Sequence, residues 1–219
     1  MEENENKQTN DLRQDAVNTF NQTKEEIKNM DIKEEVQKGK GLIAKLFFDP
    51  IGTIKEIVDD DKNHYFKTAI FVIGVWLVAI ALKLFLNHIV HKYNYTFIAI
   101  VRNIVNPLLR ILVFAVILHV FNKNSTKALP KTITAVSIAY IPTIISAVLG
   151  FLTFISSKVT YVTNPIGSLL AVIATVLRFF VTKEVLRKED NKEALKSFIK
   201  VEAVYYVIAF ALSFLELSL

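Results

Sequence analysis

The sequence predicts an all-α, polytopic membrane helix bundle, and three observations lead to that prediction. Hydrophobic side chains make up 52% of the 219 residues, whereas soluble domains contain about 45–50% even with glycine counted. The apolar residues are also unevenly placed, because residues 1–41 contain few of them and nearly everything after Phe66 is apolar. Five apolar blocks reach roughly the 20 residues that a helix needs to cross a bilayer, so we expect five transmembrane helices.

Three segments follow from this pattern: a polar, charged N-terminal extension (1–41), a pair of amphipathic interfacial helices (42–63) and the five-span domain (64–219). Residues 9–38 carry apolar side chains only at wide intervals. Two interpretations stay open for the extension. It is either a solvated, partly helical or disordered tail, or a weakly amphipathic helix that docks on a partner or on anionic lipid.

The segment "LIAKLFFDPIGTIKEIVDD" is amphipathic in two parts. Leu42 and Leu46 belong to an apolar face that lysines surround. Asp49 followed by Pro50 is typical of a helix start, with the aspartate as N-cap and the proline at the first helical position. Two short amphipathic helices ahead of a span indicate either a platform on the inner leaflet or a pair that packs under the bundle.

The five predicted spans are Phe66–Ile89, Phe97–Phe121, Ala128–Ile155, Asn164–Val181 and Phe198–Leu217. Ten Lys or Arg residues precede the first span, and a further five lie between Lys183 and Lys196 before the fifth. The first and third loops contain only Lys92 and Lys158. Because cytoplasmic loops hold the excess of basic residues, we expect a multi-pass protein of the cell membrane with a cytoplasmic N-terminus and an extracytoplasmic C-terminus.

Two short motifs carry a resemblance to a known family. "FFDPIGTIKEI" presents Phe48, Pro50 and Thr53 ahead of the first span, and "AYIP" presents Tyr140 and Pro142 in the third. With the five-span layout, residues 45–217 resemble the Ypt-interacting protein (Yip) domain family in its bacterial form. The Lys-, Asn- and Ile-rich composition is typical of a low-GC Gram-positive bacterium.

The resemblance implies a polytopic membrane protein without known catalysis. Eukaryotic relatives engage prenylated Rab-type GTPases through chains that contain a "DLYGP"-type motif. This sequence lacks that motif, so the resemblance does not imply that this protein binds GTPases.

Polar residues inside the second span form the main candidate site. Arg102, Asn106 and Arg110 are spaced four apart, so they share one side of a helix, and Pro107 is expected to interrupt that helix. Charged groups in a membrane face the bundle interior or a wet cavity. The stripe therefore either fixes the helices to one another or binds a phosphate or other anionic headgroup, for which the arginine fork is suited.

Depth in the bilayer predicts which charges can pair. Arg178 and Glu202 both lie near the inner ends of their spans, and Lys83 and Glu216 near the outer ends. Each pair is a candidate for intramembrane pairing, because unpaired charges in hydrocarbon are unfavourable. Arg110 has no carboxylate at its own depth.

The sequence contains no motif for catalysis. It has no cysteine, no phosphate-binding glycine loop, no zinc-protease helix and no nucleophile elbow. We therefore expect neither enzyme activity nor a cofactor nor a metal, and the basic charge is explained by topology rather than by nucleic acid. The predicted function is a noncatalytic membrane organiser. Its expected partners are the lipid bilayer, including anionic lipid, and membrane proteins or a second copy of the chain. The alternative is a small transporter or lipid-handling protein that uses the Arg102–Arg110 stripe.

Overall fold

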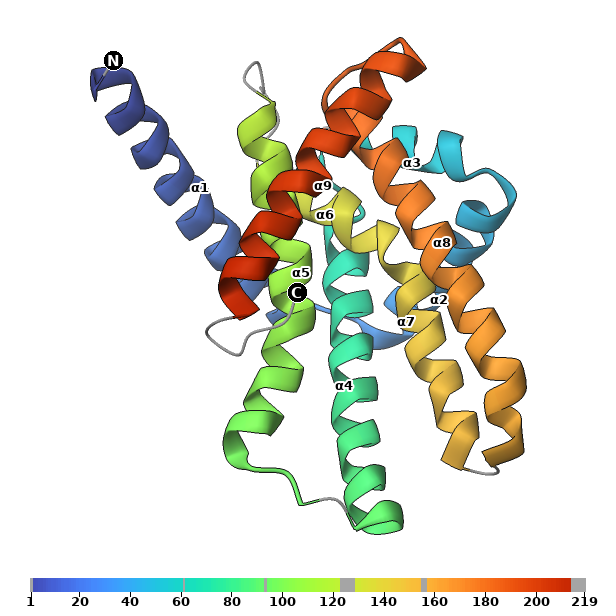
Figure 1. The fold of residues 1–219 in the computed structure, drawn as a ribbon. Helices are drawn as coiled ribbons and strands as arrows, with labels where there is room; N and C mark the ends of the chain where they lie inside the picture. The colour runs from blue at the N-terminus through green and yellow to red at the C-terminus, as the bar shows by residue number, and fades with distance from the viewer. Residues whose placement is uncertain (1, 61, 93, 123–128, 155–156, 214–219) are drawn as a thin grey trace.

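The computed structural model describes residues 2–60, 62–92, 94–122, 129–154 and 157–213, and these form helices and connections without a strand (Figure 1). The α-helices are α1 (Glu2–Lys28), α2 (Ile32–Phe48), α3 (Pro50–Asp59), α4 (Phe66–His91), α5 (Phe97–Phe121), α6 (Leu129–Ala139), α7 (Ile141–Leu149), α8 (Thr160–Val185) and α9 (Asn191–Ser213). Two 3₁₀ turns, η1 (Gly150–Phe154) and η2 (Ser157–Val159), lie between α7 and α8.

Three helices are long and apolar enough to cross a membrane. They are α4, α5 and α8, and they coincide with the first, second and fourth predicted spans to within a few residues. The third predicted span is present as a bent pair, in which α6 is followed by α7 and η1 at an angle of 40°. The structure thus has three spanning candidates among its described residues, or four if the bent pair counts as one.

The fifth predicted span coincides only in part with α9. Its end, from 214 onward, lies outside the described residues, and within them α9 does not qualify as a span. Lys196, Lys200 and Glu202 interrupt its apolar sequence. The five-span count therefore stays a prediction.

The candidate spans have one side inside the bundle and one side outside it. On α8, Leu170, Ala174 and Leu177 are buried, while Leu169 and Val172 are exposed. Similar exposed apolar side chains lie along α4 and α5. Continuous apolar surface of this kind is unfavourable in water and is what lipid-facing helices present, which indicates an integral membrane protein.

The short helix α6 lies in the centre of the bundle. It packs against α4, α5 and α8, and nearly all of its residues are buried. The chain bends at Tyr140, and Pro142 lies in the first turn of α7, where its missing N–H is tolerated. Pro107, by contrast, lies inside a continuous α5. The expectation of an interruption there was wrong, because membrane helices accommodate proline when neighbouring groups satisfy the freed carbonyl.

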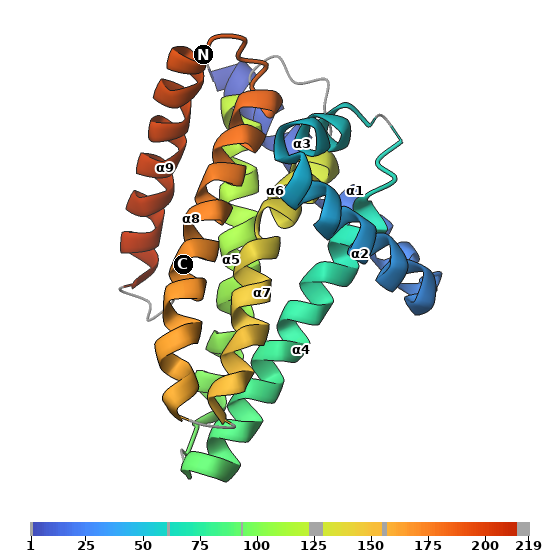
Figure 2. The ribbon, with the colours of Figure 1, turned by 90° about the vertical axis from the view of Figure 1, so that its right-hand side faces the viewer.

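The N-terminal helices pack against one end of the bundle, as Figure 2 shows from the side. Ile54, Ile57 and Val58 of α3 are almost completely buried, and α3 packs against α6 and α8. The predicted start of α3 is confirmed, since the Asp49 side chain accepts a hydrogen bond of 2.9 Å from the Gly52 N–H. The apolar sides of α2 and α3 thus face the bundle.

Candidate functional site

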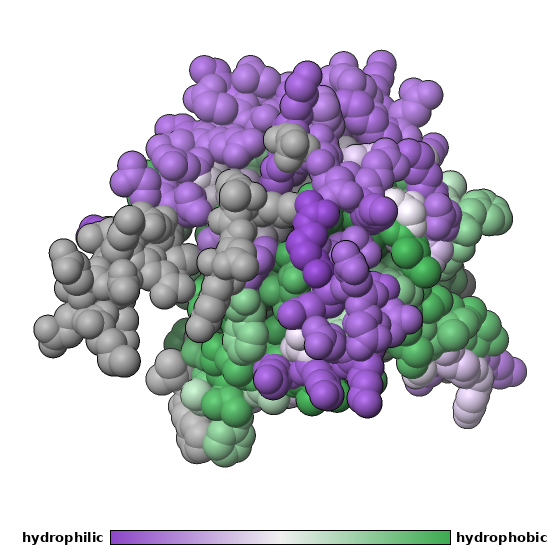
Figure 3. All heavy atoms as spheres, turned by 90° about the horizontal axis from the view of Figure 1, so that it is seen from above, coloured by the Kyte–Doolittle hydropathy of each residue, from purple (hydrophilic) through white to green (hydrophobic). Residues whose placement is uncertain are grey.

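Charged and polar side chains cover the end of the bundle at which α3 and the junction of α8 with α9 lie (Figure 3). Arg187, directly after α8, forms an ion pair of 2.9 Å with Asp59 of α3. The Asn122 amide donates a hydrogen bond of 2.8 Å to the Val185 carbonyl. These contacts hold the ends of α3, α5 and α8 together at the polar end.

A group of polar side chains, the arginine cluster, lies between α5, α8, α9 and the α6–α7 bend. It consists of Arg110, Tyr140, Arg178, Glu202 and Tyr205. Arg178 and Glu202 form an ion pair of 3.2 Å, with side chains that are 13% and 12% exposed. The structure therefore brings together the two residues whose depth predicted a pair.

Aromatic rings complete the surroundings of Arg178. Its guanidinium carbon lies 5.4 Å from the centre of the Phe114 ring and 5.7 Å from that of Tyr140. Tyr140 also stacks on Trp76 of α4, with ring centres 6.0 Å apart. Cation–π contacts at this distance stabilise a desolvated guanidinium, so Arg178 links α5, α8, α9 and the bend through charge and through ring contacts.

The predicted stripe of α5 lies along one side of the helix, and Arg102, Asn106 and Arg110 are all half-buried. Arg110 lies close enough to Tyr205 for its charge to act on the Tyr205 hydroxyl. Its Nε is buried without a hydrogen-bond partner, and no carboxylate of the described residues lies within ion-pair distance of it. The stripe thus reaches the arginine cluster at Arg110.

The second predicted pair is not tested by the structure. Lys83 is exposed on α4, and Glu216 lies outside the described residues. The family-motif residues are found in two places. Phe48 is 90% exposed at the end of α2, whereas Thr53 is buried in α3 and donates a hydrogen bond of 2.6 Å to the Asp49 carbonyl. Tyr140 and Pro142 mark the bend described above.

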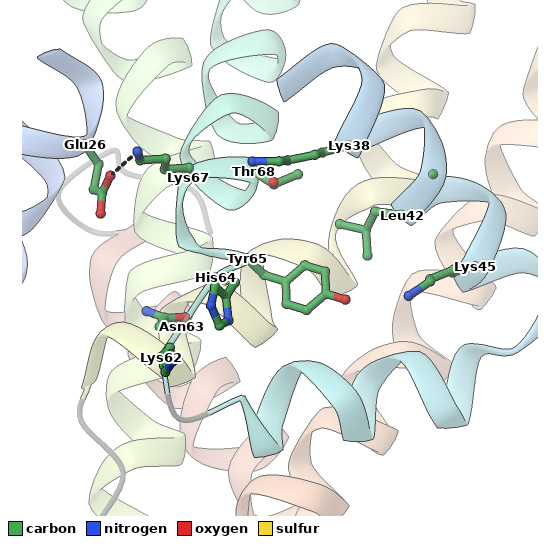
Figure 4. A pocket seen from close by; sticks show the side chains of 11 residues that line it. Glu26, Lys38, Leu42, Lys45, Lys62, Asn63, His64, Tyr65, Lys67 and Thr68 are labelled. Carbon is green, nitrogen blue, oxygen red and sulfur yellow. Dashed lines mark ion pairs between the residues drawn. The ribbon is translucent and has the colours of Figure 1, made fainter. Parts of the chain in front are cut away.

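A second polar feature, the lysine cavity, lies between α2 and the start of α4 (Figure 4). Its volume is about 590 Å³, and its polar lining includes Lys38, Lys45, Lys62 and Lys67. One carboxylate, that of Glu26, belongs to the lining. Lysines of α2, of the turn before α4 and of α4 therefore line one space, and carboxylates lie next to three of them.

The walls of the lysine cavity are held in place by hydrogen bonds. Glu35 is only 2% exposed and accepts a hydrogen bond of 2.7 Å from the Thr68 hydroxyl, which joins α2 to α4. The Tyr65 hydroxyl donates to Glu56 of α3, and Lys45 lies 3.1 Å from the same carboxylate. These contacts tie α2, α3 and the start of α4 to one another.

Ion pairs around the cavity perturb its titrating groups. The Glu34 carboxylate, 2.7 Å away, together with Glu35 raises the pKa of Lys38 above its ordinary value. The Tyr65 hydroxyl and Lys45 lower the pKa of Glu56, and burial followed by the Glu56 charge raises the pKa of Tyr65. Lys38 and Glu56 are therefore in their charged forms at neutral pH.

Sequence reasoning did not single out several of these residues. Tyr205 belongs to the arginine cluster and lies three positions after Glu202, so helical spacing was an available signal. Thr68 lines the lysine cavity, and Glu35, which accepts a hydrogen bond from its hydroxyl, lies 33 residues away in the chain. Only the packing of α2 on α4 brings that pair together.

No group of three metal-binding side chains is found in the part of the chain that the structure describes. Comparison of the chain with family models, with curated proteins and with solved structures gives no match.

Proposed function

We propose that this protein is a noncatalytic, five-span integral membrane protein that organises protein or lipid partners through its basic cytoplasmic side. In this proposal the N-terminus is cytoplasmic and the C-terminus extracytoplasmic. The alternation of basic and non-basic loops supports that orientation. The resemblance of residues 45–217 to the bacterial Yip-type domain supports the same class of protein.

The observation that carries this proposal is the packing of α1, α2 and α3 against one end of the bundle. α1 contacts α4 and α6, and Lys67 of α4 forms an ion pair of 3.1 Å with Glu26 of α1. Leu42, Leu46 and Ile54 are buried against the bundle, whereas the lysines of α2 and α3 are exposed, as are Phe47 and Phe48. A partner would therefore meet a charged surface that the spans hold in a defined position.

Removal of residues 1–38 tests the organising role. The shortened chain keeps α3 and the spans, so it is expected to insert in the membrane but to lose partners in a crosslinking pull-down. A chain that lacks only residues 1–10 is the matched control and is expected to keep them. Equal partner recovery from the full and the shortened chain would overturn the proposal.

Topology is tested by single cysteines, because the chain has none of its own. Phe20→Cys and Tyr161→Cys place thiols at positions that are 71% and 84% exposed. The proposal expects an impermeant maleimide to label intact cells at 161 and to label 20 only after lysis. A cysteine added at the C-terminus is expected to react in intact cells. Labelling of both chain ends from the same side would overturn the five-span arrangement.

A second candidate function is movement of an anionic solute or lipid along the Arg102–Arg110 stripe. The observation in its favour is the buried Arg110 Nε, which lacks a hydrogen-bond partner among the described residues. Arg110→Leu in reconstituted vesicles is the test. Loss of anion or lipid movement by a variant that still folds supports this function, and unchanged movement excludes it.

A further inference from the structure

We propose that the lysine cavity binds the phosphate of an anionic phospholipid headgroup. The cavity has the size expected of a ligand site, since pockets for small molecules span roughly 300–1,000 Å³ and this one measures about 590 Å³. The inference rests on the proposed function only in placing the cavity at the cytoplasmic membrane surface.

Charge complementarity indicates an anion. Four lysines and Glu26 line the cavity, and Glu34, Glu35 and Glu56 pair with two of these lysines from just outside it. Two of the lysines have exposed carboxylate partners, Lys38 with Glu34 and Lys45 with Glu56, whereas the pairs of Lys38 with Glu35 and of Lys67 with Glu26 are more buried. Exposed ion pairs are weak, and each ammonium group has three N–H donors, so a phosphate can share or replace these partners. Lys62 forms no ion pair with the described residues.

Two hydroxyl groups of the lining are held by carboxylates, Tyr65 by Glu56 and Thr68 by Glu35. Figure 4 shows the Tyr65 and Thr68 side chains between the lysines of α2 and those next to α4. The Thr68 hydroxyl is held by Glu35 at 2.7 Å, which fixes the wall of the cavity before any ligand arrives. Preorganisation of this kind improves affinity because few side chains must be ordered on binding.

Position indicates a lipid rather than a free phosphate. Lys67 and Thr68 lie in the first turn of α4, the first spanning candidate, so the cavity opens where that helix enters the bilayer. The side chains of Phe47 and Phe48, at the end of the same α2, are 48% and 90% exposed. Aromatic side chains beside lysines are typical of the membrane interface, where a headgroup is within reach and its acyl chains stay in the bilayer.

The test measures lipid retention by the purified full-length chain. Native mass spectrometry counts bound lipids after reconstitution in equal amounts of phosphatidylglycerol and phosphatidylcholine. The wild type is expected to retain phosphatidylglycerol preferentially. Replacing Lys45 and Lys62 by Gln is expected to weaken that retention by about fivefold for each lysine. Lys192→Gln with Lys196→Gln removes the same charge from exposed residues of α9 and is expected to change nothing.

A steric variant separates the cavity from overall charge. A side chain at Gly41, which lines the cavity, meets no atom within 4 Å at its Cβ, and the same holds for Gly74 on α4. Gly41→Leu therefore places a side chain in the cavity without altering its charge. Leucine also has a higher helix propensity than glycine. Gly41→Leu is expected to abolish the preference for phosphatidylglycerol, whereas Gly74→Leu is expected to retain it.

Three outcomes would overturn the inference: no preference in the wild type, full retention by Gly41→Leu, or an equal loss in the two lysine pairs. Soluble glycerol phosphate provides a further arm. Its displacement of bound phosphatidylglycerol at similar concentration would assign the cavity to a free phosphate instead of a lipid. Because no protein partner takes part, the outcome is independent of the pull-down that tests the organising role.

Discussion

Two arginines between the helices of this bundle are held in different ways. Arg178 has a carboxylate at 3.2 Å and two aromatic rings within 6 Å of its guanidinium carbon. Arg110 is half-buried on α5 and has no carboxylate of the described residues within ion-pair distance. The first arrangement links helices, since each partner compensates the other's desolvation. The second leaves a cation whose stabilisation must come from tyrosine, water or a ligand, so the two arginines should respond differently to substitution.

The largest effect is expected from Glu202→Gln. This change leaves Arg178 charged in surroundings where both side chains are about nine-tenths buried, and breaking such a pair destabilises a protein by roughly 3–5 kcal/mol. The free energy of unfolding, measured by detergent titration in bicelles, should fall by that amount.

Two further variants sharpen the Glu202 result. Glu193→Gln is the matched control, because Glu193 is 66% exposed and lies 3.9 Å from Lys188. The free energy of unfolding of Glu193→Gln should fall by less than about 1 kcal/mol. Joint replacement of Arg178 and Glu202 by Leu should restore most of the stability, since no isolated charge remains. Equal losses in the two Gln variants would show that the buried pair does not link the helices.

An intermediate effect of opposite sign is expected from Arg110→Leu. An arginine near the middle of a spanning helix disfavours insertion by roughly 2.5–3.5 kcal/mol. Because leucine removes part of this cost, the free energy of unfolding should rise by about 1–2 kcal/mol. The same titration measures it, with Arg110→Lys as the variant that keeps the charge. A loss comparable to that of Glu202→Gln would mean that Arg110 also links the helices.

The smallest effect is expected at the exposed Glu56, outside the spans. Glu56→Gln should lower the stability by less than about 1 kcal/mol at neutral pH, because Lys45 and Glu56 are half-exposed. Its folded-state pKa lies below the ordinary value, so the unfolded chain binds the proton more tightly. The contribution of ionised Glu56 to the free energy of unfolding is complete above the ordinary glutamate pKa, and it is lost as the pH falls through the folded-state pKa.

The pH series therefore compares wild type with Glu56→Gln. The stability difference between them should shrink between about pH 6 and pH 3. A difference that stays constant through this range would contradict the assignment of the low pKa to Glu56.

Much of the fold could be predicted from local sequence. The limits of α5 agree with the prediction residue for residue, and the start of α3 at Asp49–Pro50 is confirmed. Both depend on short-range physics: a long apolar run has its backbone bonds inside one helix, and an aspartate caps the N–H groups that follow it. The bend at Tyr140 was not predicted, because Pro107 and Pro142 look alike in sequence and differ only in what surrounds them.

The candidate sites divide in the same way. By itself the sequence determined that charged residues would lie within apolar segments, and their depth indicated that Arg178 and Glu202 would meet, since an apolar surrounding favours pairing of opposite charges. Only the tertiary structure decided that Tyr205, Phe114 and the Tyr140 bend surround Arg178, and that α2 packs on α4 to form the lysine cavity. These contacts join residues far apart in the chain. Such contacts depend on how whole helices pack, and the local spacing of residues in the sequence does not determine that packing.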